Sequence, residues 1–231
     1  MDMAQKQEIF TLVGGRVRIR RGIYNPTADA VWLAAAGGDV RARTALDVGV
    51  GSGGAAMCLG VHRPGIRITG VDISREMLDA CADNAALNNC DIELVHADIQ
   101  TWKTDRTFDL VITNPPYFTG TPARHNAHHN ADLGAWMTRA AARVRPHGTL
   151  CAIVDAARMA DAVAAIAARC GDIMILPLFG ANKNVAERVI IRARAGTRGP
   201  TRMHAGMPMN CDAVLRDGLT IDAALDTLGQ K

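Results

Sequence analysis

The sequence predicts an α/β fold: a doubly wound, mostly parallel sheet of seven strands, with a β-hairpin before it and an antiparallel strand pair at its end. Three observations support this prediction. Between residues 45 and 171, short apolar segments alternate with amphipathic helical segments, a pattern typical of parallel strands joined by right-handed crossovers. Two later strand segments follow each other without a helix, so they should pair antiparallel. Near the start, Gly14 and Gly15 separate two strand-like segments, which predicts a hairpin.

The strands of the main sheet are expected at residues 45–48, 66–71, 92–96, 108–113, 149–154, 173–178 and 188–195. No internal repeat interrupts them. We therefore interpret the chain as a single domain over residues 1–231, which consists of a basic hairpin at 1–25, a core at 26–195 and a tail at 196–231.

Three helices have recognisable limits in the sequence. Ser74 is a suitable N-cap for a helix that ends at Asn88 and Asn89. Apolar residues at helical spacing predict a second helix over residues 133–144, which stops before the turn at residues 146–148. A third helix should begin at Met159 and continue to residue 170, with Gly171 as its C-terminal stop.

The composition limits the classes of protein to consider. With 231 residues, 48% of them hydrophobic and 21% charged, the chain can build one sizeable core. The sequence has no run of eighteen apolar residues and no apolar signal segment at its start, so we expect a cytoplasmic protein without a membrane partner. The six cysteines form no Cys-x-x-Cys pair, which argues against both a disulfide framework and a metal site.

Basic residues gather in two parts of the chain. Residues 1–25 contain five Lys or Arg and two acids, and residues 183–202 contain six and one. Arg16, Arg18 and Arg20 alternate with apolar residues and so should share one face of a strand. This face is either simply solvated or follows the phosphates of a nucleic acid. The candidate RNA-binding residues are Arg16, Arg18, Arg20, Arg192 and Arg194.

A glycine turn follows the first core strand, in Asp47-Val-Gly-Val-Gly-Ser-Gly-Gly54. Gly49, Gly51 and Gly53 let the backbone approach a ligand closely, and the helix that follows favours negative charge at its start. The spacing of Gly49, Gly51 and Gly54 also fits a dinucleotide-binding fingerprint. The glycines alone therefore do not decide between two kinds of cofactor.

Acidic residues at three strand ends narrow the choice. Asp72 ends the second strand, where a carboxylate can accept hydrogen bonds from ribose hydroxyls, as it also does in NAD enzymes. Asp98 follows the third strand and can accept from an adenine amino group. Asp47 suits a cationic amino-acid group better than a pyrophosphate. Ile73 and Ile99, beside two of these acids, complete this part of the candidate cofactor set.

The fourth strand leads into Asn114-Pro-Pro-Tyr117, at the edge where parallel sheets bind their ligands. The two prolines cannot join a strand ladder, so the carbonyl of Pro115 is free to accept a hydrogen bond, as is the amide oxygen of Asn114. Tyr117 can stack on a flat substrate. When hydrogen-bond acceptors bind both N–H groups of an exocyclic amino group from outside the plane of the ring, its nitrogen can direct the lone pair at a sulfonium methyl group. We therefore expect Asn114, Pro115, Pro116 and Tyr117 to catalyse direct methyl transfer by positioning and electrostatics, although a rigid turn is the structural alternative.

On these residues, the chain resembles the Rossmann-fold methyltransferases of the small type with the Asn-Pro-Pro-Tyr signature, over about residues 10–200. Within that group it is most similar to the bacterial tRNA1(Val) adenine-37 N6-methyltransferases, whose cofactor-side segment resembles residues 25–35. The resemblance implies S-adenosylmethionine as cofactor, with Asp47 and the glycines at its methionine end, Asp72 at ribose and Asp98 at adenine. It also implies cofactor contacts from Asp29 and Asn114, and RNA, specifically tRNA, as the partner.

Several alternatives remain open at this point. A protein-glutamine methyltransferase uses the same signature, but its relatives carry a helical domain before the glycine turn, where this chain has a basic hairpin. An rRNA guanine-N2 methyltransferase typically has Phe in place of Tyr117. A catalytically silent RNA-binding module conflicts with Asn114 and the three acids, and an NAD oxidoreductase would leave the Asn-Pro-Pro-Tyr segment unexplained. His125, His128 and His129 suggest a substrate loop rather than a metal site.

Overall fold

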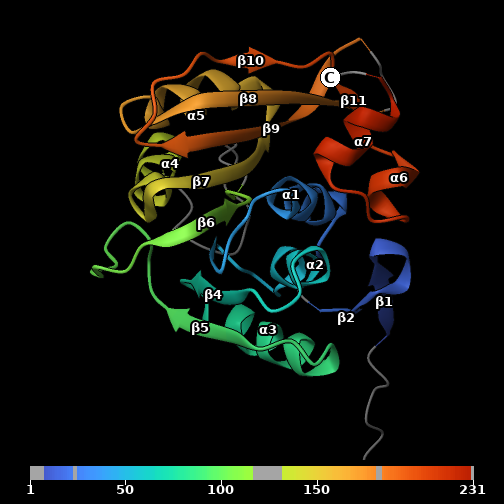
Figure 1. The fold of residues 1–231 in the computed structure, drawn as a ribbon. Helices are drawn as coiled ribbons and strands as arrows, with labels where there is room; N and C mark the ends of the chain where they lie inside the picture. The colour runs from blue at the N-terminus through green and yellow to red at the C-terminus, as the bar shows by residue number, and fades with distance from the viewer. Residues whose placement is uncertain (1–7, 23–24, 117–131, 181–183, 230–231) are drawn as a thin grey trace, which may run out of the picture.

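The computed structural model describes residues 8–22, 25–116, 132–180 and 184–229. Its main sheet has the strand order β10-β8-β9-β7-β6-β3-β4-β5, and β11 also pairs with β8. The strands are stacked from β10 at the top of Figure 1 to β5 near the bottom. Their bounds are β3 Thr44–Val48, β4 Arg67–Asp72, β5 Ile92–His96, β6 Phe108–Thr113, β7 Val144–Asp155, β8 Cys170–Phe179, β9 Ala186–Ala195, β10 Arg202–Met203 and β11 Met207–Pro208.

The predicted α/β class and all seven predicted strands are confirmed. Strands β3 to β7 run parallel, and β9 runs antiparallel to both β7 and β8. Over the described residues the sheet has nine strands, because two short strands form within the segment interpreted as a tail. Both β10 and β11 pair parallel with β8, which would otherwise be the edge strand of the sheet.

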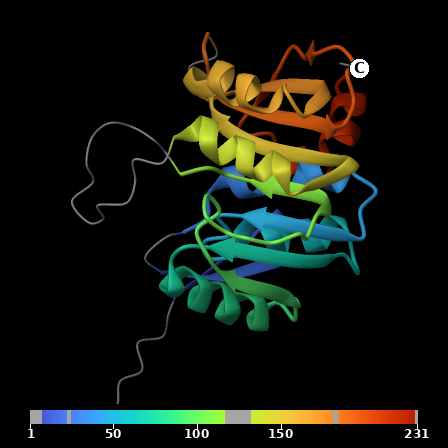
Figure 2. The ribbon, with the colours of Figure 1, turned by 90° about the vertical axis from the view of Figure 1, so that its left-hand side faces the viewer.

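In the part of the chain that the structure describes, seven α-helices lie on the two faces of the sheet: α1 Ala28–Gly38, α2 Gly54–His62, α3 Arg75–Leu87, α4 Leu133–Ala142, α5 Met159–Ile166, α6 Asp212–Leu215 and α7 Ile221–Thr227. One buried cluster joins the first three helices, the hairpin and the two C-terminal helices to the sheet. A second cluster lies under α4 and α5 on the other face. Figure 2 shows α4 and α5 together along one side of the sheet. None of the described helices is long and apolar enough to cross a membrane.

Apolar runs in the central strands supply both clusters. In β6, Leu110 and Ile112 belong to the cluster with α1 and α2, whereas Val111 between them belongs to the cluster with α4. Successive side chains of a strand point to opposite faces, so a strand covered on both sides must be apolar throughout. The apolar run at residues 110–112 follows from this double burial.

The predicted hairpin is confirmed: β1 Ile9–Leu12 pairs antiparallel with β2 Val17–Arg20. The connection is a single 3₁₀ turn over Val13–Gly15, wider than a two-residue turn, and both of its glycines have positive φ. Val17 and Ile19 are buried while Arg18 and Arg20 are exposed, as the alternation predicted. The free edge of β2 lies against α3, where the Oδ1 atoms of Asn88 and Asn84 accept from the backbone N–H groups of Arg18 and Arg20.

Two predicted boundaries are wrong. Strand β7 begins at Val144 instead of residue 149 and continues through Pro146-His147-Gly148, with a shift in its pairing to β6. Helix α5 ends at Ile166, and Gly171 lies in β8 rather than at a helix end. A Cβ atom on Gly171 would stand 2.6 Å from the carbonyl oxygen of Thr197, so a close backbone approach explains this glycine.

Candidate active site

The glycine turn joins the end of β3 to the start of α2. Gly49, Gly51 and Gly53 have φ angles of 75°, 52° and 86°, the left-handed region that favours glycine. At Gly53, a Cβ would stand 2.5 Å from the Cε atom of Met57 and 2.6 Å from the Sγ atom of Cys81. The conformation and the lack of space for a Cβ atom both require glycine here.

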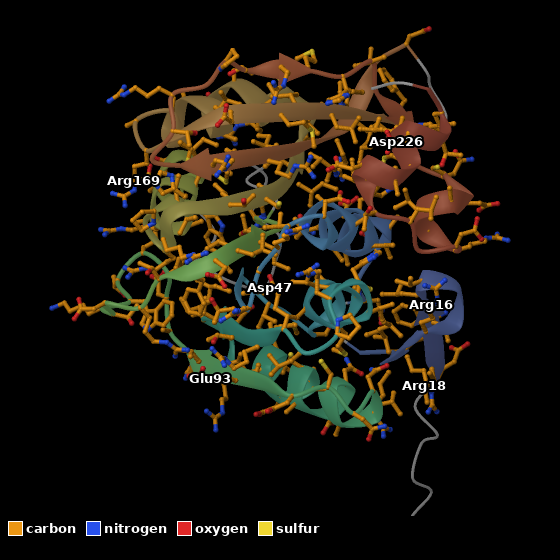
Figure 3. All side chains as sticks on the ribbon, in the orientation of Figure 1. Arg16, Arg18, Asp47, Glu93, Arg169 and Asp226 are labelled. Atoms are coloured by element: carbon orange, nitrogen blue, oxygen red, sulfur yellow. The ribbon has the colours of Figure 1, made fainter. Side chains whose placement is uncertain are left out.

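Asp47 lies directly before this turn and is 2% exposed (Figure 3). Its Oδ2 atom has no hydrogen-bond partner among the described residues. Burial raises the pKa of Asp47 to about 7, with a further contribution from the charge of Asp72, while a backbone hydrogen bond from Ala56 acts in the opposite direction. A buried carboxylate with an unused oxygen is a suitable partner for a cationic group of a ligand.

The second acid holds the glycine turn in place. Oδ2 of Asp72 accepts from the backbone N–H of Gly51 at 2.9 Å, and Oδ1 accepts from the N–H of Ser74 at 2.8 Å. Each carboxylate oxygen has two lone pairs, so both can still accept from a ligand hydroxyl. Beside Asp72, the side chain of Ile73 is 55% exposed, an apolar surface at the end of β4.

The third acid follows β5, the neighbour of β4. Oδ1 of Asp98 accepts from the N–H of Gln100 at 2.9 Å, and Ile99 is buried below it. His96, which the sequence analysis did not single out, lies opposite Asp72 in the strand pairing, and its Nε2 atom is 2.9 Å from the carbonyl oxygen of Ile73. The acids predicted to bind the cofactor therefore lie at or just after the carboxyl ends of three adjacent strands.

Asn114 comes directly after β6, next to the end of β3. Oγ1 of Thr113 donates to the carbonyl oxygen of Val48 at 2.9 Å, and Nε1 of Trp136 donates to Oγ1 of Thr113 at the same distance. These two bonds fix the end of β6 against the strand that leads into the glycine turn. Tyr117 and the three histidines at 125, 128 and 129 lie outside the described residues.

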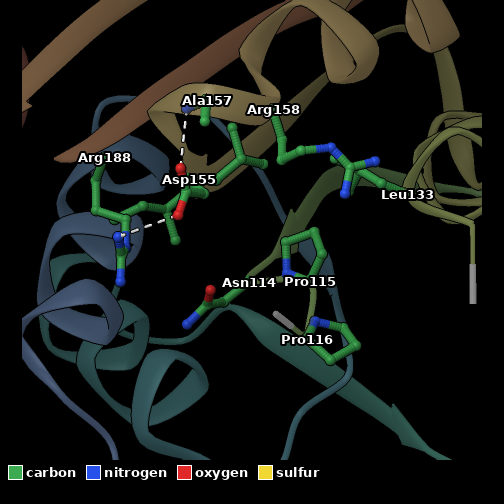
Figure 4. Close-up of a pocket in the computed structure, with 10 residues that line it drawn as sticks. Asn114, Pro115, Pro116, Leu133, Asp155, Ala157, Arg158 and Arg188 are labelled. Carbon is green, nitrogen blue, oxygen red and sulfur yellow. Dashed lines mark hydrogen bonds and ion pairs between the residues drawn. The ribbon is translucent and has the colours of Figure 1, made fainter. Parts of the chain in front are cut away.

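A cavity of about 130 Å³ opens beside Asn114 (Figure 4). Its wall is largely apolar but carries three charged side chains that the sequence analysis missed. The lining residues are Asn114, Pro115, Pro116, Leu133, Ile153, Val154, Asp155, Ala157, Arg158 and Arg188. Asp155 could have been found, because it ends a parallel strand as Asp72 does. Arg188 could not, because it lies opposite Asp155 through the pairing of β9 with β7, which the sequence does not reveal.

Asp29 reaches this cavity wall through an ion pair. Its Oδ2 atom lies 3.1 Å from Nε of Arg188, and Nη1 of Arg188 lies 3.8 Å from Oδ2 of Asp155. Asp29 is 3% exposed and lies in the first turn of α1, where Thr27 is the N-cap and accepts from the backbone N–H of Asp29. The residue predicted to contact the cofactor thus also connects α1 to the wall of the cavity.

The five predicted RNA-binding arginines do not share one environment. Arg16, Arg18, Arg20 and Arg194 are exposed. Arg192 instead lies between two acids, with Nη2 at 2.7 Å from Asp222 and Nη1 at 3.3 Å from Asp39. Its guanidinium connects β9 to the end of α1 and to α7, so its charge is paired within the fold, and its contact with RNA stays a prediction.

Comparisons with known proteins agree with this fold. The structure of a predicted O-methyltransferase of Agrobacterium tumefaciens has a TM-score of 0.65 and 26% identity, and the match covers 79% of this chain and 88% of that chain. A 16S rRNA N2 methyltransferase of T. thermophilus, in complex with AdoMet and guanosine, has a TM-score of 0.58 and 19% identity, over 84% of this chain and 52% of that one. The fold and site define an S-adenosylmethionine-dependent methyltransferase.

The chain belongs to the methyltransferase small domain family, whose model matches residues 32–174. A tRNA1(Val) (adenine(37)-N6)-methyltransferase of Glaesserella parasuis is 28% identical over 53% of this chain and 55% of its own length. A release factor glutamine methyltransferase of Lactococcus lactis is 39% identical over 31% of this chain and 26% of its own length. The chain thus matches about half or less of the length of these relatives.

Proposed function

We propose that this methyltransferase acts on the exocyclic amino group of an adenine in RNA, specifically in tRNA, and forms N6-methyladenosine. The observation that carries the proposal is the position of Asn114-Pro115-Pro116 between the glycine turn and the cavity. The similarity to a tRNA1(Val) (adenine(37)-N6)-methyltransferase over about half of both chains supports the choice of substrate.

The cofactor is S-adenosylmethionine, which supplies a methyl group on a positively charged sulfur when bound. Asp47 would hold its cationic amino-acid end, since a buried carboxylate oxygen there has no partner among the described residues. Asp72 would hold the ribose, and Ile73 would contact the edge of the adenine. Asp98, together with Ile99, would hold the adenine amino group. Each assignment follows the order of the strands β3, β4 and β5.

The reaction requires an amino nitrogen whose lone pair is directed at the methyl carbon. The amide oxygen of Asn114 and the carbonyl oxygen of Pro115 would each accept one N–H of the substrate, which favours a tetrahedral nitrogen over one conjugated with the ring. Thr113 and Trp136 hold this segment in place before the substrate arrives, so little reorganisation is needed. Tyr117 would stack on the base.

The size and lining of the cavity suit a single flat group. A cavity of about 150 Å³ with apolar walls can take a benzene-sized ring, and this cavity is close to that size. Pro116, Leu133 and Val154 offer apolar surface, while the ion-paired Arg188 and Asp155 supply polar groups at one side. Larger parts of an RNA would remain outside the cavity.

Glutamine in a protein is the second candidate substrate. The Lactococcus lactis relative is 39% identical over 72 residues, a higher identity than that of the tRNA methyltransferase over a shorter segment. A side-chain amide also presents a planar nitrogen with two N–H groups, so the same residues could accept from it. The N-terminal hairpin with its exposed arginines favours RNA, because a polyanion matches that charge.

Methyl transfer from labelled S-adenosylmethionine to separate tRNA, rRNA and protein fractions tests the proposal. We expect label in tRNA, and N6-methyladenosine after digestion to nucleosides. Label confined to protein would replace the proposal with glutamine methylation, and N2-methylguanosine in rRNA would replace it with the third alternative. An Asn114→Ala variant run in parallel shows whether the label depends on this site.

A further inference from the structure

A second and larger groove lies at the amino-terminal ends of β3 and β4, whereas Asn114 lies at the carboxyl ends of the parallel strands. Its volume is about 650 Å³. The start of β2, the end of α2, the starts of β3 and β4 and the turn between α3 and β5 form its walls. Strands β3 and β4 begin here and end at the glycine turn, so the groove and the cofactor site share two strands but lie at their opposite ends.

The groove carries more basic than acidic charge. Arg16, Arg63, Arg67 and Arg106 line it, together with Asp91 and Glu93. Arg106 donates to both carboxylate oxygens of Glu93, at 2.6 and 2.7 Å, and this bidentate pair is neutral as a unit. Asp91 is then the one acid among the described lining residues to oppose three arginines.

The arginines of the groove are available to a ligand. No described residue pairs with the side chains of Arg63 and Arg67. The guanidinium of Arg16 donates to a backbone carbonyl, that of Asp217, at 2.5 Å, and this bond does not neutralise its charge. Arg67 is exposed, and its backbone N–H donates to the carbonyl oxygen of Arg43, which brings another exposed arginine to the same edge.

The exposed face of β2 extends the groove toward the carboxyl ends of the strands, where Asn114 lies. Arg16 lies at the groove, Arg18 follows it along the strand (Figure 3), and Arg20 lies where Asn84 connects β2 to the carbonyl oxygen of Ser52 in the glycine turn. Alternate residues of a strand share one face. The three arginines therefore form a path of positive charge from the groove to the cofactor side.

The groove lies at the amino ends of β3 and β4 and the cofactor side at their carboxyl ends. The distance between these two ends limits the kind of ligand that can contact both. Strand β4 has six residues, Arg67–Asp72, which corresponds to about 20 Å at roughly 3.3 Å per residue. Successive phosphates of one strand of a DNA double helix advance about 3.4 Å along the helix axis, and we take a similar advance for a helical part of an RNA. A ligand that contacts both ends thus spans on the order of six nucleotides of a helical strand.

We propose that the groove and the arginines of β2 bind the sugar–phosphate backbone of the substrate RNA at a helical part distant from the methylated nucleotide. The inference rests on the proposed function. Arginine presents a planar fork that matches phosphate geometry, and three such side chains line the groove together with polar and apolar residues. The apolar lining residues are buried or half-buried, and none of the exposed large apolar side chains of the described residues lies in the groove, whereas a protein interface typically presents an exposed apolar centre.

The test compares two double variants that remove equal charge. Arg63→Gln/Arg67→Gln changes the groove, and Arg198→Gln/Arg202→Gln changes exposed arginines at the other end of the sheet, six strand spacings or about 30 Å away. Both are assayed on an unmodified tRNA transcript and on a short stem–loop that contains the target adenine. Arg67→Gln alone, at an exposed position, serves as the check if the double variant fails to fold.

For the groove variant we expect a KM for tRNA about tenfold higher, with kcat and the KM for the stem–loop unchanged. The slope of log affinity against log salt should fall by about 2, since two phosphate contacts are lost. The control variant should match the wild type. An unchanged KM and salt slope, with tRNA methylated normally, overturns the inference and leaves the proposed function intact.

If the wild type transfers no methyl group to RNA, the proposed function fails, and direct binding of tRNA in a salt titration still tests the groove. Weaker binding by the groove variant supports the inference, whereas equal binding by wild type and variant overturns it. Loss of binding to an acidic protein, with RNA binding unaffected, also overturns it.

Discussion

At the scale of single residues, Asp47 has the most perturbed environment among the acids of the cofactor site. Its pKa is raised to about 7, mainly by burial, from an ordinary value of 3.8. Between about pH 4 and pH 7 an unfolded chain loses this proton while the folded protein keeps it, so the contribution of Asp47 to stability falls as the pH rises through this window. The ligand-free protein therefore contains a group that disfavours its own fold at neutral pH.

An Asp47→Asn variant should separate stability from binding. Without cofactor, the variant should be more stable than the wild type at pH 8, and the difference should vanish near pH 4, as thermal unfolding at both pH values can show. For S-adenosylmethionine, titration calorimetry at pH 8 should show a loss of about ten- to a hundredfold in affinity, the size of a hydrogen bond between charged groups. Equal affinity in wild type and variant would contradict the assigned contact with the cationic end.

Wild-type affinity should itself depend on pH. A cationic ligand group favours the ionised form of Asp47, so binding must release the proton that the carboxyl holds below about pH 7. We expect the dissociation constant to decrease from pH 6 to pH 8 and to stay flat in the Asp47→Asn variant. A slope of the same size in both proteins would assign the pH dependence to another group.

Replacement of Asn114 by Ala should abolish methyl transfer and leave cofactor affinity within a few-fold of the wild type. The reason is that its side-chain oxygen is proposed to accept from the substrate nitrogen, whereas the hydrogen bonds of Thr113 hold the strand end independently. Single-turnover transfer and cofactor titration measure the two properties. Full turnover in the variant would show that the proposed mechanism is wrong.

At the scale of elements, Asn84 connects the hairpin to the cofactor turn. Its Oδ1 atom accepts from the N–H of Arg20, and its Nδ2 atom donates to the carbonyl oxygen of Ser52 at 3.1 Å, while the side chain is 2% exposed. Asn84→Ala should therefore lower the free energy of unfolding by about 2 kcal/mol, because buried backbone groups lose their partners. It should also weaken cofactor binding. Asp83→Ala, at the exposed preceding position of α3, is the matched control and should change neither property.

The ion pairs of Arg192 fasten the C-terminal helices to the sheet. Its side chain is 21% exposed and lies between Asp39 and Asp222. Arg192→Ala leaves two acids facing each other with little compensation, and we expect a loss of about 2–3 kcal/mol in chemical denaturation. Arg194→Ala, two residues further along β9 and exposed, should lose under 0.5 kcal/mol. Equal effects of the two substitutions would mean that the pairs add nothing to stability.

Element boundaries show where the sequence pattern is insufficient. The strands β3 to β6 were predicted within about two residues, because each is an apolar run bounded by polar or glycine residues. The extra length of β7 at its start was missed, since Pro146 and Gly148 normally end regular structure, and here they lie in an irregular stretch of pairing with β6. The role of Gly171 was misinterpreted, because glycine is required there by a close contact with residue 197, which is distant in the sequence.

At the scale of the whole molecule, the placement of the candidate cofactor residues was largely predictable and that of the candidate substrate cavity was not. Asp47, Asp72 and Asp98 each lie at or just after the carboxyl end of one strand of the same parallel run, so the topology alone brings them together. The cavity instead combines the segment after β6 with residues of α4, β7 and β9, and the ion pair that connects it to α1, between Asp29 and Arg188, joins residues 159 positions apart. Such a pairing depends on which strands β9 lies between in the sheet, and no local sequence pattern reveals this.

The C-terminal segment was the other part beyond prediction. We propose that residues 1–231 act as a single methyltransferase domain in which this segment is part of the fold rather than a tail. Its two short strands add to β8, α6 and α7 lie near α1, and the backbone of Met209 accepts a hydrogen bond from Nε1 of Trp32 at 3.0 Å. These contacts are made by backbone groups and by small helices whose apolar pattern is too short to be recognised.

Trp136 is both a structural contact and an optical probe. Its indole donates to Thr113, and a Cβ on Gly49 would stand 3.0 Å from the same ring, so the chromophore lies between the cofactor turn and the start of the catalytic segment. The chain has only two other tryptophans, Trp32 and Trp102. A Trp32→Phe/Trp102→Phe protein would thus emit from a single indole beside the site, and cofactor and substrate could be followed in turn by fluorescence without any label.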